Sequence, residues 1–136
     1  MEKAVSIFPP SFAQQRLWFL DQLEPGDTAY NISATFHLVG ELDLAALKQS
    51  LNEIVARHEP LRTTFQIVDD QLMQVVNQSV TLTVSVRDLC DLSPVERETT
   101  VRHLMSQEAR RPFDLVKGPL LRVASIQVGK EEYILL

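Results

Sequence analysis

The chain has 136 residues, with 13 lysines and arginines against 18 aspartates and glutamates and a formal net charge of −5. Apolar residues make up 45% and charged residues 23%, a balance that excludes a disordered chain and predicts one folded domain or part of one. The acidic charge argues against electrostatically driven binding to nucleic acid or to an anionic membrane, and the single cysteine, Cys90, excludes an internal disulfide.

No apolar run approaches the roughly 20 residues that a membrane-spanning helix needs. The N-terminal residues 1–10 lack the basic start and apolar core of a secretory signal. We therefore expect a cytoplasmic protein with no membrane partner.

The first predicted helix begins at Ser11, which follows two prolines and stands three residues before Gln14, the pattern of a capping box. Pro25-Gly26 ends it. A strand is predicted next over residues 30–39, where apolar and polar side chains alternate. Its apolar face carries Ile32, Ala34, Phe36 and Leu38.

A second helix is predicted to begin after the capping residue Asp43 and to end before Pro60, because apolar residues recur between them every three or four positions. Two strands, over residues 61–68 and 72–76, flank the acidic segment 69–71. That arrangement is typical of a hairpin.

Another strand is predicted over residues 80–86, which alternate between apolar and polar. A third helix begins at Ser93, since Pro94 and Glu96 occupy the positions of a first-turn proline and a capping acid, and it continues to about Arg110. The last predicted strands cover residues 120–128 and 132–136, around a turn at Gly129-Lys130. The order predicts a mixed α/β fold, an α+β sandwich whose partly antiparallel sheet is flanked by helices.

The side chains that could carry chemistry are few. Cys90 stands between Asp88 and Asp91, whose charges disfavour a thiolate, so it is a poor nucleophile. The three histidines have no histidine or cysteine partner at metal-ligand spacing, so we expect no metal site. For His58, at a helix end, interaction with the helix dipole is the favoured interpretation over a general base.

Arginines mark two junctions. Arg57 and Arg62 bracket the turn from the second helix into a strand, and Arg62 is expected to pair with a carboxylate because it stands between Leu61 and that strand. A second group comprises Arg110, Arg111 and Arg122. The aromatic residues Phe12, Trp18 and Phe19 fall at helical spacing and are predicted to lie in the core.

Three segments together resemble the condensation domains of nonribosomal peptide synthetases. Residues 11–20, SFAQQRLWFL, are similar to the first motif of that family, and residues 57–65, RHEPLRTTF, are similar to its second. Residues 111–115, RPFDL, with 118–122, GPLLR, resemble the stretch that follows. The resemblance covers essentially the whole chain.

The resemblance implies a chloramphenicol-acetyltransferase-like fold of two lobes with an active-site tunnel between them. Carrier proteins would deliver acyl and aminoacyl thioesters on phosphopantetheine arms, and the acceptor amine would attack the donor thioester to form an amide. The implied partners are these acyl or peptidyl carrier domains, the C-terminal lobe and adjacent synthetase domains. No cofactor would bind this chain directly.

The family's catalytic motif, His-His-x-x-x-Asp-Gly, is absent, since the sequence contains no pair of adjacent histidines. In the family that motif follows the strand that residues 132–136 resemble. We therefore expect residues 1–136 to be an incomplete N-terminal lobe, truncated before the active-site loop, with no catalytic residue and no activity alone. We also expect its last strand and missing lobe to leave an unpaired sheet edge or an apolar patch.

By resemblance, Arg62, or less readily Arg57, would pair with the aspartate of the absent loop, and a buried Arg62 would otherwise carry an uncompensated cost. His58 matches the second motif, which is structural in the family. The resemblance also places four supporting residues of the first motif near the lobe interface and tunnel, namely Ser11, Gln14, Arg16 and Trp18.

Two alternatives remain open. One is a non-catalytic binding or structural module that contacts carrier proteins. The other keeps the fold but changes the reaction to epimerisation or ester formation. Heterocyclisation is disfavoured, because those relatives differ in the first motif and replace the histidine pair.

Overall fold

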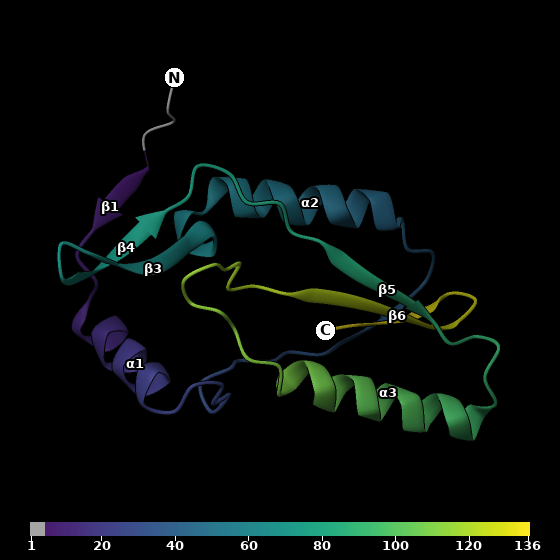
Figure 1. Ribbon diagram of the computed structural model, residues 1–136. Coiled ribbons are helices and arrows are strands. Elements are labelled where there is room, and N and C mark those ends of the chain that lie inside the picture. The colour runs from purple at the N-terminus through teal and green to yellow at the C-terminus, as the bar shows by residue number, and fades with distance from the viewer. Residues whose placement is uncertain (1–4) are drawn as a thin grey trace.

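A computed structural model describes residues 5–136 (Figure 1). Its helices are α1 (Phe12–Leu23), α2 (Leu44–Arg57) and α3 (Pro94–Ala109), with one 3-10 turn, η1 (Glu59–Arg62). Its strands are β1 (Ser6–Phe8), β2 (Phe36–Val39), β3 (Thr63–Val68), β4 (Gln71–Val76), β5 (Val84–Asp88), β6 (Val123–Gly129) and β7 (Glu132–Leu135). None of the helices within residues 5–136 is long and apolar enough to cross a bilayer.

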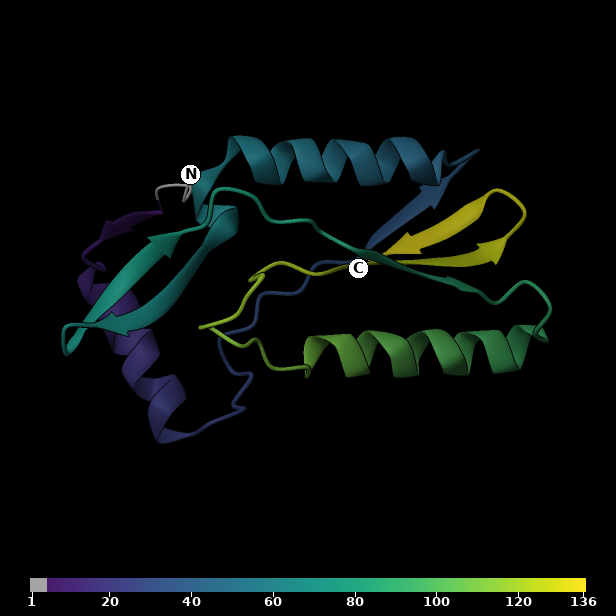
Figure 2. The same cartoon turned by 45° about the horizontal axis from the view of Figure 1, so that its top comes forward.

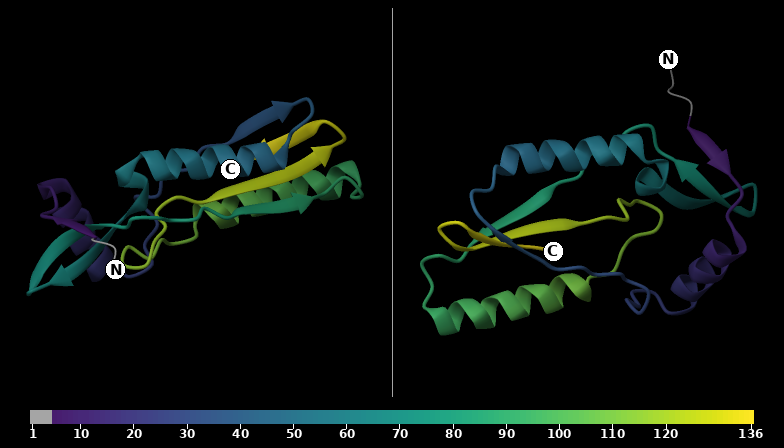
Figure 3. Two further views of the ribbon diagram at one scale, coloured as in Figure 1. Left: turned by 90° about the horizontal axis from the view of Figure 1, so that it is seen from above. Right: turned by 180° about the vertical axis from the view of Figure 1, so that it is seen from behind.

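The strands form two sheets. The smaller has the order β1-β4-β3 and is antiparallel, whereas the larger has the order β2-β7-β6-β5, with only β5 and β6 parallel. Figure 2 shows the larger sheet between α2 and α3. The small sheet and α1 lie at the other end of the molecule (Figure 3). The predicted mixed α/β fold with flanking helices is confirmed.

Helices begin where side chains reach back to the backbone. The hydroxyl of Ser11 accepts from the Gln14 amide at 3.2 Å, and the Gln14 side chain accepts from the Ser11 amide at 2.7 Å. Ser93 and Glu96 form the same capping box on α3, and Asp43 caps α2. All three predicted starts are confirmed, because each depends on residues only three positions apart.

The hairpin of β3 and β4 is also confirmed. Its register brings Val68 opposite Gln71. Asp69 and Asp70 adopt positive φ values of 49° and 60°, a conformation that aspartate tolerates better than most residues.

The main core lies between α3 and the larger sheet. Val101 of α3 packs with Ile126 and Val128 of β6, and Ile126 is only 1% exposed. Partly buried side chains surround these three: Leu89, Leu104, Met105, Ile134 and Leu136. The side chains of β7 thus complete the core that α3 covers.

Several predicted strands are shorter than expected. The strand predicted over residues 30–39 covers only Phe36–Val39, because its pairing with β7 begins at Phe36, and Ile32 is 97% exposed. The strand predicted from residue 120 begins at Val123. The strand predicted from residue 80 begins at Val84, because the Asn52 side chain pairs with the backbone of Leu82 in place of a strand.

The aromatic prediction was wrong for two of three residues. Phe12 is 91% exposed and Phe19 is 62% exposed, because α1 packs through one face only against the small sheet and no residue of α1 is fully buried. Of the expected unpaired edge or apolar patch, the edge is not found at the last strand, since β7 lies between β2 and β6. Large apolar side chains are nevertheless exposed, Ile32 and Phe36 among them.

Candidate functional site

Arg62 occupies the junction between η1 and β3. Its side chain is only 15% exposed, and its Nη1 donates to the carbonyl oxygen of Asn77 at 2.6 Å. Nη2 lies 3.6 Å from a carboxylate oxygen of Glu59, whereas the buried Nε has no hydrogen-bond partner within residues 5–136. The charge is therefore partly compensated by groups of the described chain, whereas pairing of Arg62 with an aspartate of the absent loop stays a prediction.

Asn77 completes this junction from the end of β4. Its backbone amide and its Nδ2 donate to the carbonyl of Arg62 at 2.9 and 3.1 Å. Nδ2 also donates to the hydroxyl of Thr64 at 3.2 Å. These bonds hold the two ends of the hairpin together and fix the backbone that carries Arg62.

The segment that follows α3 lies against the same hairpin. The amide of Phe65 donates to the carbonyl of Leu115 at 2.8 Å. Gly118, at φ +61°, approaches β3 so closely that a Cβ would stand 2.8 Å from Cγ2 of Thr64. The second and third sequence motifs are thus in contact.

The first motif reaches the hairpin through α1. Nε2 of Gln14 donates to Oε1 of Gln74 at 3.1 Å, and the ring of Trp18 lies 6.4 Å from that of Phe65. Ser11 acts through its cap on α1, whereas Arg16 is exposed. All three motifs therefore meet at the β3–β4 hairpin, where Gln14, Glu59 and Phe65 help to line a groove of about 380 Å³.

Arg57 and His58 lie outside this meeting point. The Arg57 side chain is 72% exposed and its guanidinium stands 3.8 Å from Glu53 on the same helix. His58 is the C-terminal cap residue of α2, where its backbone amide donates to Ile54 at 3.0 Å. Of the two arginines in the second motif, only Arg62 is positioned by several groups.

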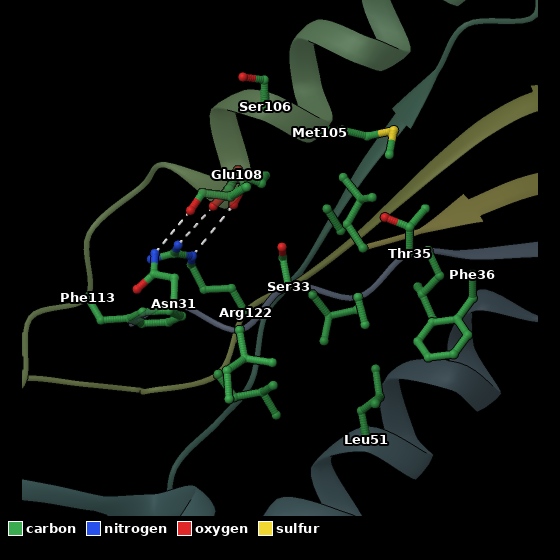
Figure 4. Close-up of a pocket in the computed structure, with 18 residues that line it drawn as sticks. Asn31, Ser33, Thr35, Phe36, Leu51, Met105, Ser106, Glu108, Phe113 and Arg122 are labelled. Atoms are coloured by element: carbon green, nitrogen blue, oxygen red, sulfur yellow. Dashed lines mark hydrogen bonds and ion pairs between the residues drawn. The ribbon is translucent and has the colours of Figure 1, made fainter. Parts of the chain in front are cut away.

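A second hollow, which we call the cleft, opens beside the end of β7 (Figure 4). Its volume is about 520 Å³. Leu51 of α2 and Met105 of α3 lie on its two sides, and Leu135 and Leu136 also line it. Its lining is mostly apolar and contains no histidine or cysteine, so the described side chains supply it with no thiol or imidazole for acid–base or nucleophilic chemistry.

Arg122 anchors one wall of the cleft. It donates to three carbonyls at and just beyond the end of α3, those of Glu108, Arg111 and Pro112, at 3.2, 2.6 and 2.9 Å. Its guanidinium lies 3.8 Å from the centre of the Phe113 ring. Burial lowers the pKa of Arg122, and the nearby charge of Arg111 adds to that effect.

Asn31 binds the same helix end, donating to the carbonyls of Ala109 and Arg111 at 3.2 and 3.0 Å. We call the contacts of Asn31 and Arg122 with these carbonyls the carbonyl clasp. Sequence reasoning noted Arg122 but missed Asn31 and Asn77. The signal that could have found them is an asparagine at the start or end of a predicted strand, because side-chain amides at such positions often bind unpaired backbone groups.

Two other chemical features concern residues named in the sequence analysis. Within residues 5–136, no cluster of three or more histidine, cysteine, aspartate or glutamate side chains could hold a metal ion. A hydrogen bond to Asp88 raises the pKa of the Cys90 thiol, which agrees with its interpretation as a poor nucleophile.

A family model described as "Condensation domain" matches residues 5–136. A linear gramicidin synthase protein of Brevibacillus parabrevis is 46% identical over 94% of this chain, and phosphinothricin tripeptide synthetase PhsC of Streptomyces viridochromogenes is 38% identical over 93%. The chain spans 2% and 12% of these two relatives.

Solved structures share the fold. The starter condensation domain of rhizomide synthetase RzmA matches with a TM-score of 0.86 at 24% identity, over 96% of this chain and 31% of that one. A four-domain nonribosomal peptide synthetase bound to AMP and glycine matches with a TM-score of 0.83 at 22% identity, over 99% of this chain and 10% of that one.

Proposed function

Because the chain belongs to the condensation-domain family, we propose that it is the N-terminal part of a domain that joins two carrier-bound substrates through an amide bond. The observation that supports this most directly is the meeting of all three sequence motifs at the hairpin that carries Arg62. The longer protein would be a nonribosomal peptide synthetase acting in the cytoplasm.

The reaction is an acyl transfer. The nitrogen of the acceptor amine attacks the carbonyl carbon of the donor thioester, a C–N bond forms and the C–S bond breaks. The amine loses a proton and the carrier's phosphopantetheine leaves as a thiol. The acid–base group is not in this chain, which has no pair of adjacent histidines, so residues 1–136 alone should form no amide.

Arg62 is proposed as a positioning residue. Its buried Nε has no hydrogen-bond partner among the described residues, and its Nη groups are held by Asn77 and Glu59. A guanidinium fixed in this way can bind a carboxylate with defined geometry. In the longer protein, that carboxylate would belong to the aspartate of the catalytic loop.

Gln14 and Trp18 support this arrangement indirectly, because each joins α1 to the hairpin. Ser11 stabilises the start of α1. Arg16 is exposed, Arg57 pairs with Glu53, and His58 joins α2 to η1 through its backbone, since its carbonyl accepts from the Leu61 amide at 3.1 Å. For Arg16 we propose a place on the surface that faces the C-terminal lobe.

The test uses the longer condensation domain with loaded donor and acceptor carriers. Arg62→Lys keeps the charge but loses the planar fork, so amide formation should fall roughly 10- to 100-fold, mainly in kcat. Arg57→Lys is the matched control and should stay within about twofold.

Equal activity of the Arg62→Lys and unchanged domains would contradict the positioning role. Unfolding midpoints of both variants separate a loss of geometry from a loss of fold. A longer domain that binds loaded carriers but forms no amide would favour the binding module, and one that inverts an aminoacyl stereocentre would favour an epimerase.

A further inference from the structure

We propose that Asn77 is a positioning residue for the amide-forming reaction, because it holds both the backbone and the guanidinium of Arg62 in one geometry. Asn77 lies outside the three sequence motifs, just after β4 ends at Val76. The inference rests on the proposed function, in which Arg62 positions the catalytic loop. The role of Asn77 is indirect, since it acts on the reaction only through Arg62.

Arg62 and Asn77 close the end of the β3–β4 hairpin (Figure 1). The register pairs Thr63 with Val76, so Arg62 and Asn77 stand next in the ladder. The Asn77 amide donates to the Arg62 carbonyl at 2.9 Å, as a hydrogen-bonded antiparallel pair requires. The Asn77 carbonyl, however, accepts from Nη1 of the Arg62 side chain at 2.6 Å. The guanidinium thus takes the place that a backbone amide has in a regular ladder.

The Asn77 side chain fixes the backbone end of Arg62. Its Nδ2 donates to the Arg62 carbonyl at 3.1 Å and to the hydroxyl of Thr64 at 3.2 Å, so both amide hydrogens have an acceptor. We call the three hydrogen bonds that join Arg62 and Asn77 the arginine clamp. An arginine held at its backbone and at its guanidinium keeps far fewer side-chain rotamers than one held at either end alone.

The second partner of the guanidinium is weaker. Nη2 of Arg62 lies 3.6 Å from Oε1 of Glu59, which is too long for a good hydrogen bond, and the Glu59 side chain is 62% exposed. Exposed ion pairs contribute little to stability and hold geometry poorly. The Asn77 carbonyl is therefore the closest partner of the guanidinium in the described chain, and the place of that carbonyl depends on the arginine clamp.

The same side-chain amide connects the second motif to the third. Thr64 of the second motif is only 4% exposed. Its hydroxyl accepts from Asn77, and its Cγ2 would lie 2.8 Å from a Cβ added at Gly118 of the third motif. Removing Nδ2 therefore takes the donor away from a buried hydroxyl and loosens the Arg62 carbonyl at the same time.

Asn77 stands apart from the hollows described above. The residues that line the groove beside the hairpin and those that line the cleft do not include Asn77. A defect in the geometry of a positioning group lowers kcat, whereas a lost substrate contact raises KM. The proposed role therefore predicts a loss in kcat with KM nearly unchanged.

The test measures amide formation by the longer condensation domain with loaded donor and acceptor carriers. Asn77→Ala removes Nδ2, so kcat should fall about 5- to 10-fold while KM stays within about twofold. Asn52→Ala is the matched control, because Nδ2 of Asn52 also donates to two acceptors, the carbonyls of Lys48 and Leu82, at 2.8 and 3.0 Å. None of these three residues lies in a motif, so Asn52→Ala should lower the unfolding midpoint by a similar amount and leave kcat within about twofold.

A double variant shows whether Asn77 acts through Arg62. Once Arg62→Lys has removed the planar fork, Asn77→Ala should cost nothing more, so the double variant should match Arg62→Lys within about twofold. Losses that multiply in the double variant would overturn the positioning role. Full activity of Asn77→Ala, or an equal kcat loss in Asn52→Ala, would also overturn it.

A spectroscopic measurement separates this proposal from the amide-forming one. In the longer domain, a held guanidinium should give distinct nitrogen NMR signals for Nη1 and Nη2 of Arg62. Asn77→Ala should merge these signals through faster rotation, whereas Asn52→Ala should not. An active domain whose Arg62 signals are unaffected by Asn77→Ala would overturn the role of Asn77 alone. A domain that shows the merging but forms no amide would support the arginine clamp and contradict the proposed function.

Discussion

Asn31 and Arg122 donate hydrogen bonds to the same oxygen, the backbone carbonyl of Arg111, at 3.0 and 2.6 Å. The last carbonyls of a helix have no partner within it and carry the negative end of its dipole. Within α3 itself, Arg122 donates to the carbonyl of Glu108 and Asn31 to that of Ala109, and the carbonyl of Arg111, just beyond the C-cap, accepts from both. The end of α3, the segment before β2 and the start of β6 are thereby joined.

Removing the guanidinium fork should destabilise the chain. Arg122→Lys keeps the charge but cannot reach the carbonyls of Glu108, Arg111 and Pro112 together, so the free energy of unfolding should fall by about 1–3 kcal/mol in urea titration. Arg102→Lys, whose guanidinium is exposed on α3, is the control and should change little.

The shared acceptor also predicts coupling. Asn31→Ala and Arg122→Lys combined should destabilise by an amount that differs from the sum of the single effects by roughly 0.5 kcal/mol or more. Strict additivity in the double-mutant cycle would mean that the two donors act on the helix end independently.

Gly118 should be intolerant of a side chain for two separable reasons. Gly118→Ala combines two costs: a positive φ of 61°, which an alanine rarely adopts, and a Cβ placed 2.8 Å from Cγ2 of Thr64. Gly26→Ala has only the first cost, since φ is 86° but nothing lies within 4 Å of the added Cβ. We expect a loss of about 1 kcal/mol for Gly26→Ala and a larger loss, roughly 2–3 kcal/mol, for Gly118→Ala.

Thermal or urea unfolding of both alanine variants checks this order. Thr64→Val keeps the Cγ2 atom that the new Cβ contacts and should not restore the stability of Gly118→Ala. Thr64→Ser removes that atom and should recover part of the stability that Gly118→Ala loses beyond Gly26→Ala. Equal losses at Gly118 and Gly26 would contradict the close approach of the two motifs.

Cys90 should alkylate slowly. Hydrogen bonding to Asp88 raises the pKa of its thiol, and the charge of Asp91 contributes least among the groups around it. At mildly alkaline pH, Asp88→Asn should therefore speed the reaction with iodoacetamide several-fold, and Asp91→Asn should speed it less. Unchanged kinetics in Asp88→Asn would show that access, and not the carboxylate, limits the reaction.

The capping box of α3 should contribute a pH-dependent part of stability. Hydrogen bonds from Ser93 lower the pKa of the Glu96 carboxyl below its ordinary value. A lowered folded-state pKa stabilises the fold above the unfolded-state value, and this contribution is lost as the pH falls through the lower, folded-state pKa.

Urea unfolding at a series of acidic pH values tests this. Glu96→Gln should be less stable than the unchanged chain at neutral pH, and the difference should shrink as the pH falls through the acidic range. Ser93→Ala removes the hydroxyl donor and should flatten the same profile. A pH-independent difference between the two chains would contradict the assignment to Glu96.

Sequence signals between neighbouring residues predicted much of the fold. The starts of all three helices and the hairpin turn depend on side chains and backbone groups within four residues of each other, so Ser11, Asp43 and Ser93 were identifiable from the sequence. Strand order and strand length were not, since pairing depends on which distant segment lies alongside.

The residues of the candidate site were likewise only partly predictable from the sequence. Arg62 was recognisable because an arginine among apolar strand residues needs a partner, but its partner Asn77 comes from the far end of the hairpin. Helical spacing placed Phe12 in the core, yet spacing does not reveal which face of α1 another element covers. Asn31 gave no periodic signal at all.

The most direct test of the account is amide formation from a donor-loaded and an acceptor-loaded carrier. Residues 1–136 alone should yield no condensed thioester above a protein-free control, while the longer domain should yield it and lose most of that activity with Arg62→Lys. Product formation by residues 1–136 alone would show that the chemistry resides within this chain and would contradict the account.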